Sequence, residues 1–214
     1  NVFTLNNAAD NRRKLTDTIV YNDTKIISEG KLNYRPKTLS NAIFIEPNEK
    51  FSDMRRLLTS RSLSNLKVFN YPSIEYIKDP KDSTGQSLIT NITLVPKKRA
   101  TFIPSIDVTH SNIQDFGVQG TVGVQFNNVF KGAEILTLGV RGNIGSSASK
   151  YRSNQNTFFD ILEYGADVKL SIPRFLFFTN TDKIIPRRMF PVTTMSLGYS
   201  SQQNIGLDKE NLTG

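Results

Sequence analysis

The sequence predicts an α+β domain over residues 1–97, followed over residues 98–214 by the first about five antiparallel strands of a transmembrane β-barrel. Three observations predict this. From Phe116 to Asn127, apolar residues or glycine occupy the even positions and glycine, amide or hydroxyl residues the odd ones, as in a strand with one apolar face. Similar runs of about 8–12 residues recur, close to the ~9–11 that a tilted membrane-spanning strand needs. Before Pro96 the periodicity is mixed.

The first part of the chain is expected to have the order strand, helix, helix, strand, strand (βααββ), with a hairpin inserted after the first strand. The expected strands are Val2–Leu5, 18–21, 24–27, 73–78 and 88–95. Asn22-Asp23 suits the tight turn of the hairpin, and the polar residues 79–85 form the linker between the last two strands.

Two helices are expected between the hairpin and the last two strands. Pro36 begins the first, because proline is favoured in a first turn, and Glu46-Pro47-Asn48 ends it. Ser52 is the expected N-cap of the second, which ends near Asn65. The apolar helical spacing is carried by Leu39, Ala42 and Ile43 in the first helix and by Met54, Leu57, Leu58 and Leu63 in the second.

The second half of the chain contains the alternating runs. The expected strands are 100–109, 116–127, 136–144, 162–172 and 194–200. A soluble antiparallel sandwich also alternates, because one face of each sheet packs on a core. Run length, connections that alternate between tight and long, and charges on the polar face favour the membrane. Those mid-strand charges are Arg141, Glu163, Asp167 and Lys169.

The formal net charge of +8 does not point to a nucleic-acid partner. Basic residues are scattered, and no helix-turn-helix, zinc or RNA-binding signature accompanies them. Two basic clusters lie next to expected strand ends, where they either meet anionic lipid headgroups or form an ordinary solvated surface. No apolar run of about 18 residues is present, so no transmembrane helix is expected.

Neither an enzymatic activity nor a metal or cofactor is expected. The chain has one histidine and no cysteine, which excludes disulfides and a histidine- or cysteine-rich metal site. His110 and Ser111 do not suit a hydrolytic pair, because adjacent side chains on a strand point apart. Glu163 and Asp167 share a strand face, which fits a charged lumen wall better than general acid–base chemistry.

Four short sequence stretches occur in an order that is characteristic of a known protein family. They are Asn33-Tyr34-Arg35-Pro36 before the first helix, Arg55-Arg56-Leu57-Leu58 in the second, Phe126-Asn127-Asn128-Val129 between two alternating strands, and Ser171-Ile172-Pro173-Arg174 after the fourth. This ordered set resembles the POTRA-plus-barrel family, whose best-known members are BamA and TamA. The inserted hairpin resembles the versions found in Bacteroidetes. The usual Gly-Phe after the second POTRA helix is replaced by Lys67-Val68-Phe69.

The resemblance implies an outer-membrane protein assembly or insertion factor, with a periplasmic POTRA domain and a barrel in the bacterial outer membrane. The implied partners are the lipid bilayer, unfolded outer-membrane protein clients and accessory lipoproteins. A passive barrel, a porin or surface antigen with a periplasmic domain, and a soluble two-domain binding protein remain alternatives.

The implied topology assigns each connection to one side of the membrane. External loops are expected at 111–115, at 145–156 and from Gly206 onward, and periplasmic connections at 127–134 and 173–191. Five strands do not close a barrel, so the chain is expected to be part of a longer protein or to be completed by strands supplied elsewhere.

Two sheet edges are expected to bind an incoming strand through unpaired N–H and C=O groups. The client-binding edge comprises Ser73, Ile74, Glu75, Tyr76, Ile77 and Lys78, unless a neighbouring domain covers it. The barrel seam, implied by the resemblance, comprises Phe102, Ile103, Pro104, Ser105, Ile106, Asp107 and Val108. Pro104 lacks an N–H, and either weakens the seam or occupies a lipid-facing position without a hydrogen-bond demand.

Overall fold

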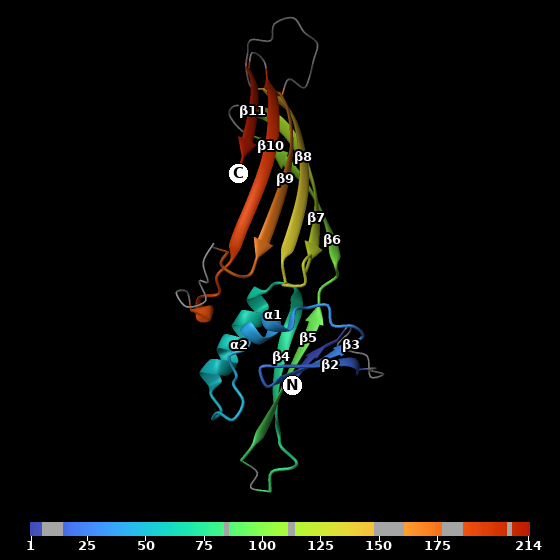
Figure 1. Ribbon diagram of the computed structural model, residues 1–214. Helices are drawn as coiled ribbons and strands as arrows, with labels where there is room; N and C mark the ends of the chain where they lie inside the picture. Colours follow the sequence, from blue (N-terminus) through green and yellow to red (C-terminus); the bar gives the residue numbers. More distant parts are fainter. Residues whose placement is uncertain (6–14, 84–85, 111–113, 148–160, 177–185, 205–206) are drawn as a thin grey trace, which may run out of the picture. The chain divides into compact units, whose positions relative to one another are not determined.

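The computed structural model describes residues 1–5, 15–83, 86–110, 114–147, 161–176, 186–204 and 207–214, and these form a β-rich fold with two sheets and few helices (Figure 1). The chain divides into two compact units. Unit 1 comprises Asn1–Arg99, Asn127–Glu134 and Ile172–Thr193, and unit 2 comprises Ala100–Phe126, Ile135–Ser171 and Thr194–Gly214.

Unit 1 contains a five-stranded sheet in the order β2-β3-β1-β5-β4. The strands are β1 (Val2–Thr4), β2 (Leu15–Tyr21), β3 (Thr24–Glu29), β4 (Phe69–Lys78) and β5 (Leu88–Pro96). The hairpin β2–β3 turns at Asn22 and Asp23, both with positive φ, as a two-residue hairpin turn requires. Strand β1 pairs in parallel with both β3 and β5, so the hairpin extends the sheet.

Helix α1 (Pro36–Asn41) and helix α2 (Asp53–Asn65) follow the hairpin, and α2 packs against β4. Ser52 is the N-cap of α2, as expected, and its side chain accepts a hydrogen bond from the Arg55 backbone N–H at 3.5 Å.

The expected apolar face of α2 is wrong in part. Met54 and Leu57 are exposed, whereas Leu63 and Thr59 are buried. Thr59 tolerates burial because its hydroxyl donates to the Arg55 carbonyl at 2.8 Å and accepts from the Phe44 N–H at 3.0 Å. Thr59, whose hydroxyl both donates and accepts a hydrogen bond, therefore takes a buried position on α2 in place of one of the expected apolar residues.

Tyr34 belongs to the buried core of unit 1. Its ring packs on Phe69 with the ring centroids 4.8 Å apart, and both side chains are buried. Burial disfavours the charged phenolate, and it raises the pKa of Tyr34 from 10.0 to about 12.

The Tyr34 phenol makes the stability of unit 1 sensitive to alkaline pH. The folded state holds the phenol proton more tightly than the unfolded state, because folding raises the pKa of Tyr34. The free energy of unfolding therefore keeps its full value below about pH 10 and falls as the pH rises to about 12. Since one pKa unit corresponds to about 1.36 kcal/mol, the free energy of unfolding should fall by about 2–3 kcal/mol across this window. Urea unfolding of wild type and Tyr34→Phe over this range measures the difference. Equal falls in both proteins would contradict the prediction.

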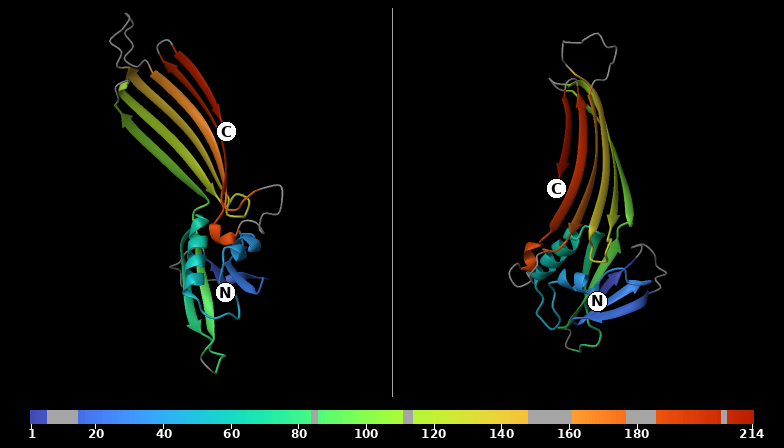
Figure 2. Two further views of the ribbon diagram at one scale, coloured as in Figure 1. Left: turned by 90° about the vertical axis from the view of Figure 1, so that its left-hand side faces the viewer. Right: turned by 45° about the horizontal axis from the view of Figure 1, so that its top comes forward.

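Unit 2 is a six-stranded antiparallel sheet in the order β11-β10-β9-β8-β7-β6. Its strands are β6 (Ala100–Thr109), β7 (Gln114–Asn127), β8 (Ile135–Ser147), β9 (Ile161–Ile172), β10 (Thr193–Asn204) and β11 (Leu207–Thr213). The views in Figure 2 show them side by side as one curved layer.

The expectation of five strands is wrong, because β11 stands where an external loop was expected from Gly206 onward. Strand β10 also continues beyond Tyr199 to Asn204, and it pairs with β11 from Gly198 opposite Thr213 to Asn204 opposite Leu207. No helix among the described residues is long and apolar enough to cross a membrane.

Candidate functional site: open strand edges and a cationic pocket

One face of the unit 2 sheet is apolar and exposed. The register aligns its residues across strands, with Leu138 opposite Val168 and Val140 opposite Ala166. Val140 is 56% exposed and Leu197 58%, and the other large apolar side chains exposed on this face follow the same alternation. A sandwich would cover this face with a second sheet, whereas these side chains are exposed.

The opposite face carries glycine and polar residues. Gly139 lies opposite Asp167 and Arg141 opposite Gly165, and the Arg141 guanidinium is 3.9 Å from the Glu163 carboxylate. The mid-strand charges expected for the polar face therefore lie on one side of the sheet, away from the apolar residues.

The expected seam lies on β6, which is the edge strand of the unit 2 sheet. All ten of its residues are exposed, including Ile106 at 79%. Pairing with β7 runs without interruption from Ala100 opposite Phe126 to Thr109 opposite Gly117, and Pro104 lies opposite Val122. The other long side of β6 has no strand partner among the described residues, so it presents an open edge.

The expected client-binding residues Ser73–Lys78 lie on β4, which is an edge strand of the unit 1 sheet. The register shifts between Asn70 and Ser73, so a bulge separates the start of β4 from this segment. Tyr76 packs edge-on against Phe51 with the ring centroids 5.0 Å apart, and Ile77 is half exposed. The structure thus places the two expected site segments on edges of two different sheets.

The turn Asn127–Glu134 between β7 and β8 belongs to unit 1 and is tied to the segment before α1. The Arg35 N–H donates to the Lys131 carbonyl at 2.7 Å, and the Asn128 amide donates to the Asn33 carbonyl at 2.8 Å. Inside the turn, the buried Glu134 carboxylate accepts the Gly132 N–H at 2.7 Å. These hydrogen bonds fix the conformation of the turn and give the buried Glu134 carboxylate a donor.

Gly132→Ala should lower the free energy of unfolding of unit 1 by about 1–3 kcal/mol, the range for overpacking. A Cβ at this position would overlap the Glu134 carboxylate, which is only 2% exposed, so this carboxylate would have to move within packed surroundings and would lose its hydrogen bond from the Gly132 N–H. Urea unfolding measures the change. In a Glu134→Ala background the same substitution should cost less, because the obstructing carboxylate is gone. An equal cost in both backgrounds would contradict this explanation.

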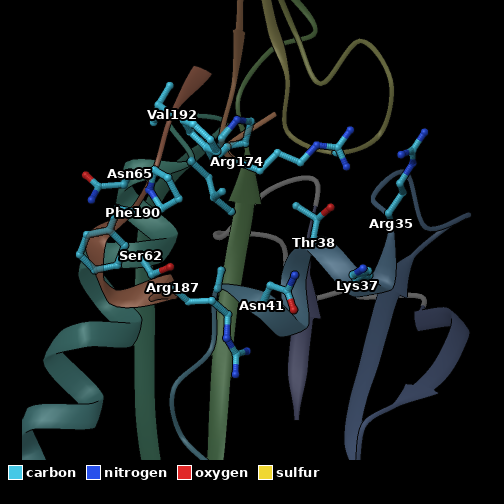
Figure 3. Close-up of a pocket in the computed structure, with 16 residues that line it drawn as sticks. Arg35, Lys37, Thr38, Asn41, Ser62, Asn65, Arg174, Arg187, Phe190 and Val192 are labelled. Atoms are coloured by element: carbon cyan, nitrogen blue, oxygen red, sulfur yellow. The ribbon is translucent and has the colours of Figure 1, made fainter. Parts of the chain in front are cut away.

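A pocket of about 240 Å³ lies within unit 1, lined by residues of α1 and α2, by Gly132 and by the segment on either side of residues 177–185 (Figure 3). Four of its lining residues are cationic: Arg35, Lys37, Arg174 and Arg187. Thr38, Asn41, Ser62 and Asn65 add polar groups. The pocket therefore has the composition of an anion-binding site.

Three contacts hold the pocket-lining residues on either side of 177–185 in place. The Thr193 hydroxyl donates to the Arg174 carbonyl at 2.9 Å and accepts the Leu176 N–H at 3.0 Å. Phe190 ends the short 3₁₀ helix η2 (Arg187–Met189), and its ring lies edge-on to Phe44 with the centroids 6.3 Å apart. These contacts fix the backbone at Arg174 and beside Arg187.

Sequence reasoning did not identify this pocket. Its cations come from segments more than a hundred positions apart, and of the four only Arg187 belongs to a basic pair, Arg187-Arg188. The described residues contain no group of three or more histidine, cysteine or acidic side chains placed to hold a metal ion.

No family model and no curated protein matches the sequence. Among solved structures, the fold is similar to CdiB from Acinetobacter baumannii, at 16% sequence identity and a TM-score of 0.41, over 87% of this chain and 41% of that chain. The chain thus spans about two-fifths of the length of that structure. At this level of similarity the comparison assigns no family.

Proposed function

We propose that the protein assembles or inserts client β-barrel proteins in the bacterial outer membrane by offering an open strand edge to them. The single observation that carries this proposal is the exposed edge strand β6 on a sheet whose apolar face is uncovered. In this proposal unit 2 crosses the membrane, and unit 1 is a POTRA-type domain in the periplasm.

The exposed apolar face supports the membrane part of the proposal. Soluble monomers rarely expose contiguous apolar patches larger than a few hundred Å². Lipid acyl chains cover such a face without a second sheet, and the glycine and polar residues then face the lumen. Five of the six strands, from 10 residues in β6 to 14 in β7, are long enough for a tilted crossing of the bilayer, whereas β11 has 7 residues.

The open edges support the assembly part. Within a bilayer, an unpaired backbone N–H or C=O costs several kcal/mol, so a client strand that pairs with β6 relieves this cost for both partners. No nucleophile or cofactor takes part in such a step. In unit 1, the edge of β4 offers a second place for an unfolded client or an accessory lipoprotein to add a strand.

A liposome assay tests the proposal. The protein is reconstituted into vesicles, an unfolded outer-membrane protein in urea is diluted onto them, and folding is followed by the gel-mobility shift of the folded client. The proposal predicts faster folding than in vesicles that lack the protein. Ion conductance without faster client folding would favour a porin, and recovery of the protein in the aqueous fraction without detergent would favour a soluble binding protein.

A further inference from the structure

The cations of the unit 1 pocket make no ion pair with the residues that the structure describes, although the buried Glu134 carboxylate accepts the N–H of the lining residue Gly132. None of its lining residues is acidic, and none of the four cations is within salt-bridge distance of a carboxylate among the residues that the structure describes. Elsewhere in unit 1, by contrast, Arg56 pairs with Asp53 at 2.9 Å, and Arg55 pairs with Glu49. The pocket therefore favours an anionic ligand.

The pocket is built next to strand ends in the sequence. Pro173, Arg174 and Phe175 directly follow β9, and Val192 directly precedes β10. If β9 and β10 cross the membrane, as in the proposed function, these lining residues occur where the chain leaves the bilayer on the periplasmic side. Headgroup phosphates are the anions present at that depth.

Apolar side chains lie beside the cations. Phe175 is 42% exposed and Val192 51%, and both line the pocket with Arg174. Figure 3 shows Val192 and Arg174 at one end of the pocket and Arg187 beside Asn41 at the other. This combination of guanidinium groups and exposed apolar side chains matches a ligand with a phosphate on one side and an acyl region on the other.

We propose that this pocket binds the phosphate of a glycerophospholipid headgroup, with Arg174, which lies at the same end as Val192, as its principal ligand and with Arg35, Lys37 and Arg187 adding to the positive field. The inference rests on the proposed membrane-spanning role of unit 2, but it does not require client insertion. A guanidinium presents paired donors that match two phosphate oxygens, whereas Lys37 contributes a single charge.

Native mass spectrometry of the full chain in a neutral detergent tests the proposal, with phosphatidylglycerol as the probe. Arg174→Gln/Arg187→Gln should weaken lipid binding about tenfold or more, because the double variant loses the charge-assisted contact of Arg174 and two of the four positive charges of the pocket. The matched control is Arg61→Gln/Lys67→Gln, which removes two exposed cations of the same unit that do not line the pocket. This control should change binding less than about twofold.

Each outcome decides one point. Equal losses in the two double variants would overturn the pocket as the binding site and indicate general surface attraction. Inorganic phosphate that displaces the lipid at similar concentration would identify a free-phosphate site, and a peptide carboxylate that displaces it more effectively would identify a client site. Because the assay contains no client, a failure of client insertion in liposomes leaves its result unchanged.

Discussion

Ile106→Pro should slow client insertion in the liposome assay by about tenfold while leaving the unit 2 sheet folded. In an antiparallel strand the N–H and C=O of one residue point to the same side, and successive residues alternate. Pro104 sits within the uninterrupted pairing of β6 with β7, so we infer that its nitrogen faces the open edge, where no ladder bond is lost. The N–H of Ile106, two residues on, then faces the same edge.

The expected tenfold change in insertion rate follows from the loss of one hydrogen bond between β6 and the client strand. Its removal costs about 1–1.5 kcal/mol, and about 1.4 kcal/mol is a factor of ten in rate when client pairing limits insertion. Ile106→Val is the side-chain control and should insert clients at the wild-type rate. Asp107→Pro is the opposite control: the Asp107 N–H faces β7, so this variant should disrupt the sheet itself.

Pro104→Val provides the reverse change. It restores an outward N–H to the edge and should strengthen client pairing, which an engineered cysteine pair between β6 and the client reports as a higher disulfide yield. The natural chain has no cysteine, so the signal comes only from the introduced pair. Wild-type insertion rates in Ile106→Pro would remove β6 from the proposed mechanism.

Gly165→Ala should lower the free energy of unfolding of unit 2 by about 1–3 kcal/mol, the usual cost of overpacking. A Cβ on Gly165 would lie 2.8 Å from the backbone carbonyl oxygen of Tyr199 and 3.2 Å from the Arg141 Nε. The oxygen belongs to the backbone of β10, so relief requires two paired strands to separate.

Gly120→Ala is the matched control, because a Cβ there meets no atom within 4 Å. Glycine inside a strand is entropically unfavourable by about 0.5–1 kcal/mol, so this variant should be neutral or slightly more stable. Urea titration in detergent micelles, followed by far-UV circular dichroism, measures both. Similar midpoints for the two variants would contradict a close approach of β9 and β10 at Gly165.

The strands that are most regular in sequence were the most predictable. The two cleanest runs agree with the structure to within two residues: β7 begins two residues earlier than expected and β9 one residue earlier, because period-two alternation directly reflects the two faces of a strand. Strand β11 was missed because it contains three successive charged residues and no alternation, and its pairing with β10 determines its conformation.

The two kinds of candidate site also differ in how far the sequence predicts them. An edge segment such as Ser73–Lys78 is local in sequence, so a strand pattern and an assumed topology are enough to propose it. The pocket is non-local: Arg35 and Arg187 line it together only when the turn between β7 and β8 and the residues on either side of 177–185 lie against α1 and α2. No periodicity in the sequence marks this arrangement.

The interleaving of unit 1 with unit 2 along the chain has a consequence for biosynthesis. Unit 1 is complete only when Ile172–Thr193 has joined Asn1–Arg99, so its last packing step waits until residue 193 has left the ribosome. Contacts of such large sequence separation are typical of slow folding. A polypeptide ended at Arg99 would lack the segment that packs beside Phe44, and it would be a poor substitute for the intact domain.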